Sequence, residues 1–357
     1  MPGRDRSLTL FVPGLLNPAA DVARLPASSW PALSSLEMLL SRGRWQHRVA
    51  RGLEASLFAL FGYCPEPGAE LPCAAITRAI DGGAPDDGWW LRADPVHLHA
   101  DHRSLIMLAH EQLHLTEQEA SDLHSEVERA FADQGWHWEV RAPQRWYVRL
   151  PEPARIRTHG IAATLGHDIL TRLPEGEDAR LWRGYLNEVQ MLLHAHPVNQ
   201  SRVDRGQLPA NSLWFWGGGR LPAAAQTSWS SVRSDDLLTR ALAQHAGTAH
   251  APLPAAEDGV QWLSDADNDL LVLHEAYPHA QLSDPYSWLE HLSALEQRWF
   301  VLLRDAVQQG VLGGLTLVTD DGRACRVSRG DLRRWWRRSR PCSAFLERDS
   351  PAHASKN

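Results

Sequence analysis

The stretch from Leu186 to Pro222 combines residue types that could bind a small anion. Asn199, Arg202 and Asn211 provide polar side chains, and the expected strand at 212–216 runs directly into Gly217, Gly218 and Gly219. Glycines at a strand end let backbone N–H groups converge on a phosphate or a carboxylate. A tight bend on a buried strand also explains glycines alone. No helix pattern follows them, so the stretch is not a P-loop.

A second run of chemically active residues, HxHxDH, supplies His97, His99, Asp101 and His102. Two imidazoles at i and i+2 share one face of a strand, and this run binds zinc in one class of hydrolase. Here the preceding strand carries Arg92 and Asp94 rather than an apolar run, and only 167–168 offers a downstream His-Asp pair. A polar strand end with solvated histidines is the simpler interpretation.

Positioning these residues requires a scaffold, and the two ends of the chain predict one. Apolar runs at 8–12, 269–273 and 314–318 read as buried strands, and they alternate with helical patterns at 31–41, 235–244 and 286–309. This pattern predicts an α/β core with a parallel sheet and helices on both faces. Ligands of such sheets bind beyond the carboxyl ends of the strands, which here carry Pro13, His274 and Asp320-Asp321.

The middle of the chain has a different pattern and predicts an inserted α+β domain. Strands are expected at 89–98 and 104–108, a hairpin at 136–150, and helices at 116–134 and from Leu186 to His196, where Pro197 ends the helical pattern. Residues 65–88 are rich in Pro, Gly and Asp and mark the boundary. We therefore expect a discontinuous core of residues 1–85 and 223–346, an insert of residues 86–222, and a disordered tail at 347–357.

Composition narrows the class of protein. The 357 residues are 43% hydrophobic, which suffices for a proper core, and their net charge of −7 argues against a general nucleic-acid binder. The four cysteines form no CxxC pair and read as reduced thiols. The apolar run 8–16 is too short to span a membrane. We expect a cytoplasmic protein with no membrane association, in which the arginine-rich run 333–338 forms a solvated helical face.

Several segments resemble the archaeal-type cofactor-independent phosphoglycerate mutases, metalloenzymes of the alkaline phosphatase superfamily. The match is strongest for HPVN-x-x-R-x-x-x-G-x-x-PAN, from His196 to Asn211. LEASLFALFGYCP resembles the segment around the family's nucleophilic serine, and WWLRADPVHL resembles the strand that opens its inserted domain. A bacterial family of RpfE-type regulatory proteins is more similar, on the WFWGGG and LNEVQMLLH segments. The resemblance implies an alkaline-phosphatase-like core.

The same resemblance implies that the catalytic residues are degenerate. The family's metal-binding Asp falls on Pro13, its nucleophilic Ser falls on Leu53, and its Asp-His pair on the last strand falls on Asp320-Asp321. The spacing of its Asp-x-x-x-His segment is broken around 279–284. Leucine cannot attack phosphorus, and a two-metal site needs carboxylates and imidazoles at these positions. Ser56 and His274 are the fallback residues for catalysis. We expect Pro13, Leu53, His279 and Asp320 to converge.

These observations favour a regulatory or metabolite-sensing pseudoenzyme that needs no cofactor. Its ligand is expected to be a small phosphorylated or carboxylated metabolite; no protein partner can be named. The binding residues are expected to be Arg92, His196, Asn199, Arg202, Asn211, Gly217, Gly218 and Gly219, with Trp216 where the family has an Arg. Two alternatives stay open: an active metal-dependent phosphomutase or phosphotransfer enzyme using Ser56, Asp320 and His274, and a zinc hydrolase using the HxHxDH run. Either would require Mn or Zn.

Overall fold

The computed structural model describes residues 6–19, 22, 25–47, 50–64, 68–101, 104–255, 258–259, 261–262, 268–281 and 284–346. The contacts divide the chain into two compact units. The first contains residues 1–56, 227–240 and 248–357, and the second contains residues 57–226 and 241–247. The second unit therefore begins earlier than the expected boundary near residue 86. The tail at 347–357, expected to be disordered, lies outside the described residues.

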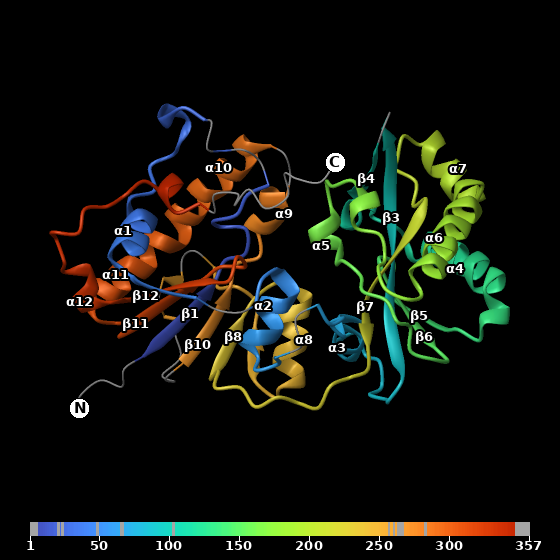
Figure 1. Cartoon of the computed structure of the whole chain (residues 1–357), viewed down its shortest axis with the longest axis horizontal. Coiled ribbons are helices and arrows are strands. Elements are labelled where there is room, and N and C mark those ends of the chain that lie inside the picture. The colour runs from blue at the N-terminus through green and yellow to red at the C-terminus, as the bar shows by residue number, and fades with distance from the viewer. Residues whose placement is uncertain are drawn as a thin grey trace. The chain divides into compact units, whose positions relative to one another are not determined.

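The first unit is built on a seven-stranded sheet in the order β2-β12-β11-β1-β10-β8-β9 (Figure 1). β11, β1, β10, β8 and β9 run parallel to one another, whereas β12 pairs antiparallel with β11 and with β2. The strands are β1 (Ser7–Phe11), β2 (Arg44–His47), β8 (Ser231–Arg233), β9 (Ala249–Ala251), β10 (Asn268–Val272), β11 (Gly314–Val318) and β12 (Arg323–Ser328). The expected fold class, a parallel-rich α/β sheet flanked by helices, is confirmed.

Helices from both ends of the chain build the core of this unit. Leu8 and Leu10 of β1 share one buried apolar cluster with Leu36 of α1, Trp288 of α10 and Leu303 of α11. The helices are α1 (Ser34–Arg42), α9 (Ala276–Gln281), α10 (Pro285–Leu295), α11 (Val301–Gln309) and α12 (Arg329–Leu332), with a π-helical segment at Glu296–Phe300. The boundary between the units falls within α2 (Leu53–Leu60) and α8 (Leu237–His245).

The second unit is an α+β fold around five antiparallel strands in the order β4-β3-β6-β5, with β7 paired to β3. The strands are β3 (Trp89–Asp101), β4 (Ser104–Ala109), β5 (His137–Ala142), β6 (Arg145–Leu150) and β7 (Ser212–Gly219). The helices are α3 (Cys73–Ile80), α4 (Glu117–Ala130), α5 (Ile161–Thr164), α6 (Ala179–His194) and α7 (Pro197–Asp204). None of the described helices of the chain is long and apolar enough to cross a membrane.

The alternation of side chains along β3 gives the second unit two different interiors. Trp89, Leu91 and Ala93 belong to an apolar cluster with α4 and α6. The intervening Trp90 belongs to a smaller cluster with α3, and because successive residues of a strand point to opposite faces, Arg92 and Asp94 share that side. The charged residues that made this strand look unusual for a core are therefore buried between the sheet and α3.

Four local expectations are corrected. Pro197 ends α6 as expected but is also the first residue of a new helix, α7, because the fixed φ of proline suits that position. β7 runs through all three glycines rather than ending before them. The segment 65–88, taken as a linker, contains α3. The arginine-rich run 333–338 follows the short helix α12 and is not helical itself.

The start of α1 also differs from expectation, and the reason is a contact distant in sequence. α1 begins at Ser34 rather than near the expected residue 31, and its N-cap residue, Leu33, provides no side-chain bond. Instead the buried carboxylate of Glu296, in the π-helical segment, accepts the N–H groups of Ser35 (2.7 Å) and Leu36 (3.0 Å). A carboxylate at this position satisfies free N–H groups and complements the helix dipole.

We predict that Glu296→Ala lowers the free energy of unfolding by about 2–3 kcal/mol, because two buried N–H groups lose a charged acceptor. Chemical denaturation of both proteins measures the loss. Gln297→Ala, at the adjacent exposed position, is the matched control and should change stability by less than about 0.5 kcal/mol. Equal losses in the two variants would contradict the capping role of Glu296.

Candidate functional site

Strand register brings together the residues expected at the carboxyl edge of the parallel sheet. Phe11 of β1 lies opposite Val272 of β10 on one side and opposite Val318 of β11 on the other. Two residues beyond these positions the chain reaches Pro13, His274 and Asp320. Adjacent strands lie about 5 Å apart. Residues more than 250 positions apart in the sequence therefore meet at this edge.

Asp320 is the centre of this edge and is fully engaged by its neighbours. Its side chain is only 3% exposed, and its carboxylate accepts the backbone N–H of Gly14 (2.7 Å) and the Nδ2 of Asn17 (3.1 Å). Burial raises the pKa of the Asp320 carboxyl above its ordinary value, and Asp321 beside it acts in the same direction, whereas the two hydrogen bonds oppose the rise. Asp321 itself bonds to Thr319 Oγ1 (2.6 Å) and to the backbone N–H of Arg323 (3.0 Å).

The segment aligned with the family's nucleophile also reaches this edge. The N–H of Gly52 donates to the carbonyl of Asp320 (2.7 Å). Leu53, the next residue and the first of α2, therefore lies at this edge. Leu53 is 4% exposed and has no group that can attack phosphorus. Ser56 is equally buried, and its Oγ has no hydrogen-bond partner among the described residues. Among the described residues, no base is hydrogen-bonded to this hydroxyl.

His279 lies on α9, which packs against the loop after β1. A Cβ placed on Gly14 would lie 2.5 Å from the Cβ of Ala280, so α9 approaches this loop as closely as glycine permits. The His279 ring hydrogen-bonds Ser287 Oγ (2.7 Å) and stacks on His291. The expected convergence of this segment with Pro13, Leu53 and Asp320 is thus observed for the backbone. The His279 imidazole itself contacts residues of the next helix, α10.

The HxHxDH run lies at the end of β3. His97 is buried, and its Nδ1 is 2.9 Å from the carbonyl oxygen of Pro209, whereas His99 is exposed. Desolvation lowers the pKa of His97. The side chain of Asp101 and the whole of His102 lie outside the described residues. In the described part of the chain, no group of three His, Cys, Asp or Glu side chains is placed to hold a metal ion.

The residues expected to bind a metabolite fall into two groups at opposite ends of β7. At its start, Asn199 bonds both the N–H and the carbonyl of Ala210, and Arg202 donates to the carbonyl of Leu208 (2.9 Å). The glycines lie at its other end. A strand advances about 3.3 Å per residue, so Ser212 and Gly218 are about 20 Å apart. One small metabolite cannot contact both groups.

The group at the start of β7 is occupied by internal bonds. Arg202 also bonds Glu119 (2.8 Å) and the carbonyl of Leu113, and it is 2% exposed. His196 caps α7 through its Nδ1, which accepts the N–H of Val198 (3.2 Å). Asn211 pairs with both backbone groups of Leu98, at 2.8 Å each, as a neighbouring strand would. These residues of the HPVN…PAN motif hold α6, α7 and β7 together.

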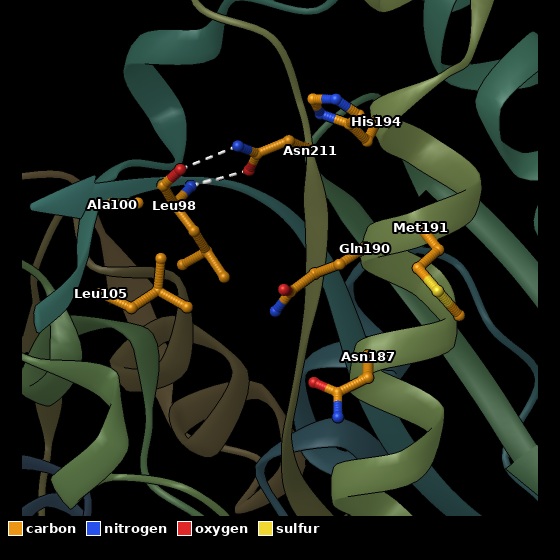
Figure 2. Close-up of a pocket in the computed structure, with 8 residues that line it drawn as sticks. All are labelled: Leu98, Ala100, Leu105, Asn187, Gln190, Met191, His194 and Asn211. Carbon is orange, nitrogen blue, oxygen red and sulfur yellow. Dashed lines mark hydrogen bonds between the residues drawn. The ribbon is translucent and has the colours of Figure 1, made fainter.

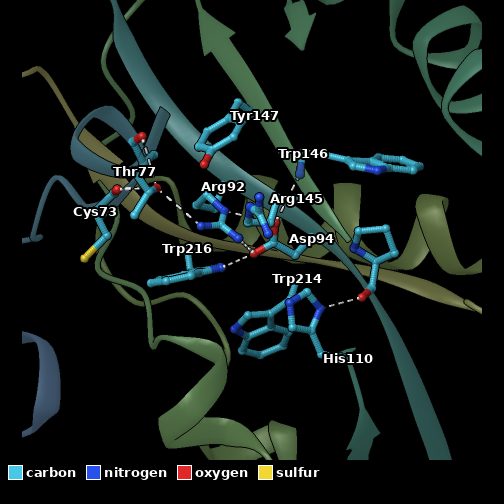
Figure 3. A network of polar contacts seen from close by, with 12 residues as sticks. Cys73, Thr77, Arg92, Asp94, His110, Arg145, Trp146, Tyr147, Trp214 and Trp216 are labelled. Carbon is cyan, nitrogen blue, oxygen red and sulfur yellow. Dashed lines mark hydrogen bonds and ion pairs between the residues drawn. The ribbon is translucent and has the colours of Figure 1, made fainter. Parts of the chain in front are cut away.

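Arg92 belongs to the group at the glycine end of β7 (Figure 3). Its guanidinium makes two bonds to Asp94, at 3.0 and 2.8 Å, and one to Thr77 Oγ1 of α3 (3.3 Å). It lies 5.1 Å from the ring centres of both Tyr147 and Trp216. Trp216, at the position where the resembling family has an Arg, donates its indole N–H to Asp94 (2.8 Å). Asp94 raises the pKa of Arg92 despite its burial.

The three glycines permit close packing against α3 and Trp89. A Cβ would lie 2.8 Å from the Cβ of Cys73 at Gly217, 2.3 Å from the Trp89 ring at Gly218, and 2.6 Å from Pro72 at Gly219. The N–H groups of two of them also bind side-chain acceptors, one of which is an anion. Gly217 donates to Thr158 Oγ1 and Gly218 donates to the Glu70 carboxylate, each at 3.0 Å. The sequence gives no motif that singles out Glu70 or Thr158.

A pocket of about 460 Å³ opens between α6 and the β3–β4 hairpin (Figure 2). Leu98, Ala100 and Leu105 form its apolar side, and Gln190 points across it from α6 in the close-up. Its other lining residues are Asn187, Met191, His194 and Asn211. The described lining contains no arginine or lysine, so this pocket does not supply the charge that a phosphorylated ligand requires.

Comparison with known proteins gives a distant relationship. No protein-family model matches the chain. It is 26% identical over 180 residues to a probable 2,3-bisphosphoglycerate-independent phosphoglycerate mutase of Geobacter sulfurreducens, a match covering 49% of this chain and 44% of that protein. It is 41% identical over 59 residues to the corresponding mutase of Methanothrix thermoacetophila, covering 16% and 15% of the two chains. The matches thus span less than half the length of these relatives.

Among solved structures, a protein from Pyrococcus horikoshii is similar in fold, with a TM-score of 0.52 and 12% identity over 91% of this chain and 88% of that one. This likeness extends over both units of the chain, whereas the sequence matches to the mutases are local. The chain is therefore distantly similar to the cofactor-independent phosphoglycerate mutases.

Proposed function

We propose that this protein is a degenerate phosphoglycerate-mutase-like protein that senses or regulates without metal-dependent catalysis. The observation that carries the proposal is the state of Asp320, whose carboxylate is bound by the amide of Gly14 and by Asn17. In a metal-dependent relative, this strand edge would need carboxylates and imidazoles aimed at the cations. Here Pro13 and Leu53 approach the edge instead, and neither side chain has a ligand atom or a nucleophile.

The runner-up is phosphotransfer by Ser56, because its buried hydroxyl has no hydrogen-bond partner among the described residues. A buried hydroxyl without a partner is costly and therefore marks a position worth testing. Against this alternative, an unactivated serine is a weak nucleophile, and Ser56 lies one helical turn beyond Leu53. The zinc-hydrolase alternative is weaker, because the strand that precedes the HxHxDH run carries the buried Arg92–Asp94 pair instead of an apolar run.

The proposed ligand is a small phosphorylated or carboxylated metabolite that binds to the second unit. Of the two ends of β7, we assign the ligand to the glycine end. The side chains at the other end are used to hold α6 and α7, so Arg202→Ala is expected to lower stability. At the glycine end, backbone N–H groups already bind a carboxylate, that of Glu70.

We predict that the purified protein does not interconvert 2- and 3-phosphoglycerate, with or without added Mn, because Leu53 and Pro13 cannot provide a nucleophile or a metal ligand. A coupled assay, with a mutase from one of the relatives as the positive control, measures this. Metal analysis of the same sample is the companion measurement. Turnover that Ser56→Ala abolishes would establish the phosphotransfer alternative, and turnover that survives in Ser56→Ala would refute the residue alignment.

We predict that Asp320→Asn stabilises the protein at pH 7 by about 1 kcal/mol. Because burial raises the folded-state pKa of Asp320, the ionised carboxylate opposes folding once the pH exceeds the unfolded-state value near 4, whereas an amide carries no such charge. The amide oxygen can still accept the Gly14 N–H. After a rotation, the buried Oδ1 of Asn17, which has no partner among the described residues, can accept the amide N–H of the new side chain.

The pH dependence of the stability difference between Asp320→Asn and the unaltered protein checks the sign of this effect. The gain from Asp320→Asn should shrink as the pH falls toward 4, where the carboxyl of the original protein binds a proton in the folded state. Denaturation curves at pH 7 and pH 4 give both values. A variant that loses stability at pH 7 would show that the ionised Asp320 is a net stabilising group.

A further inference from the structure

The Glu70 carboxylate sits in a cradle of donors from two distant segments. Oε1 accepts the N–H of Gly218 (3.0 Å) and the hydroxyl of Thr158, and Oε2 accepts the N–H of Thr158 (2.7 Å). The N–H of Gly217 donates to Thr158 Oγ1 (3.0 Å), which leaves the hydroxyl proton directed at Glu70. Both oxygens of one carboxylate are thus bound by donors fixed by the fold.

The donors of this cradle do not depend on flexible cationic side chains. Two are backbone amides held by the fold, and the hydroxyl is oriented by a third, so binding a carboxylate here orders few additional groups. Hydrogen bonds to an ionised acceptor are about twice as strong as neutral ones. Burial raises the pKa of Glu70, and these bonds counteract the rise.

Glu70 also links the cradle to α3. It lies three residues before Cys73, the first residue of α3, and Thr77 of the same helix bonds Arg92. A change in the position of Glu70 therefore acts on the segment that leads into α3.

We propose that Thr158, Gly217 and Gly218 form a carboxylate-binding site, that Glu70 is its resident occupant, and that a free carboxylate takes its place when Glu70 leaves. This proposal rests on the proposed sensing function only for the identity of the natural ligand, a carboxylated metabolite. In the unaltered protein the backbone holds Glu70 against these donors, so its effective concentration there exceeds that of a free carboxylate at the concentrations tested, and a simple carboxylate does not displace it. The site is tested by removing the competitor.

The experiment measures the melting temperature and the backbone amide NMR shifts of Glu70→Ala in sodium acetate and in sodium chloride of equal ionic strength. With an acetate dissociation constant near 10 mM, about 100 mM acetate should raise the melting temperature of Glu70→Ala by about 2–3 °C over chloride. The amide signals of Thr158, Gly217 and Gly218 should shift with saturation. The unaltered protein should show neither response.

Two matched variants sharpen the test. Glu70→Gln keeps a side chain of the same size in the cradle and should respond to acetate far less than Glu70→Ala. Adding Thr158→Val to Glu70→Ala removes one donor and should lower the acetate affinity at least fivefold. If Glu70→Ala responds to acetate no more than to chloride, or responds to phosphate alone, the carboxylate site is refuted.

If Glu70→Ala does not fold in chloride, the yield of refolded protein in acetate is compared with the yield in chloride. Recovery in acetate supports the site, and equal failure in both salts overturns it. None of these measurements depends on mutase activity. Failure of this inference and failure of the proposed non-catalytic function are therefore distinguishable.

Discussion

The hydrogen bonds that hold β1 between two parallel neighbours fix the geometry of the first unit. Because Phe11 lies opposite both Val272 and Val318, the strands β1, β10 and β11 end at the same level of the sheet. This register places Gly14 within reach of Asp320 and brings the start of α2 to the same edge. The edge is where a parallel α/β sheet presents catalytic groups. In this chain the same geometry is used to satisfy Asp320 internally.

The second unit is organised by a different constraint, a charged pair on a strand buried on both faces. An ion pair away from water is tolerated only when its remaining hydrogen-bonding groups are satisfied. Asp94 meets this condition with Arg92, the indole of Trp216 and the backbone N–H of Trp146. α3 completes the arrangement through Thr77. α3 therefore contacts both the buried pair, through Thr77, and the glycine segment of β7, through Pro72 and Cys73.

Much of the fold could be predicted from the sequence, because hydrophobic periodicity reports burial directly. The strands β1, β10 and β11 and the helix α4, with its Thr116–Glu119 capping box, lie where their patterns predict. The elements that were missed depend on information outside their own segment. α7 starts at a proline that also ends α6, and the cap of α1 comes from Glu296, some 260 residues away.

The candidate site was harder to predict for the same reason. The motif around Asn199 and Arg202 looks like a ligand site, yet its polar groups bond to backbone carbonyls whose positions no local pattern reveals. The glycines indicated an anion, but the anion is a side chain of the same chain, Glu70. Sequence spacing identified which residue types could bind. It could not show which of them the fold had already used.

The discontinuous first unit has a consequence for how the chain folds during synthesis. The two neighbours of β1 are made about 260 and about 300 residues after it, which takes a ribosome about 13–60 s. During that time the apolar strand β1 and the start of α1 lack the partners that satisfy them, whereas residues 57–226 form a nearly continuous unit that can fold first. The nascent segment of β1 and α1 therefore stays open to chaperone binding until residues 268–318 have been made.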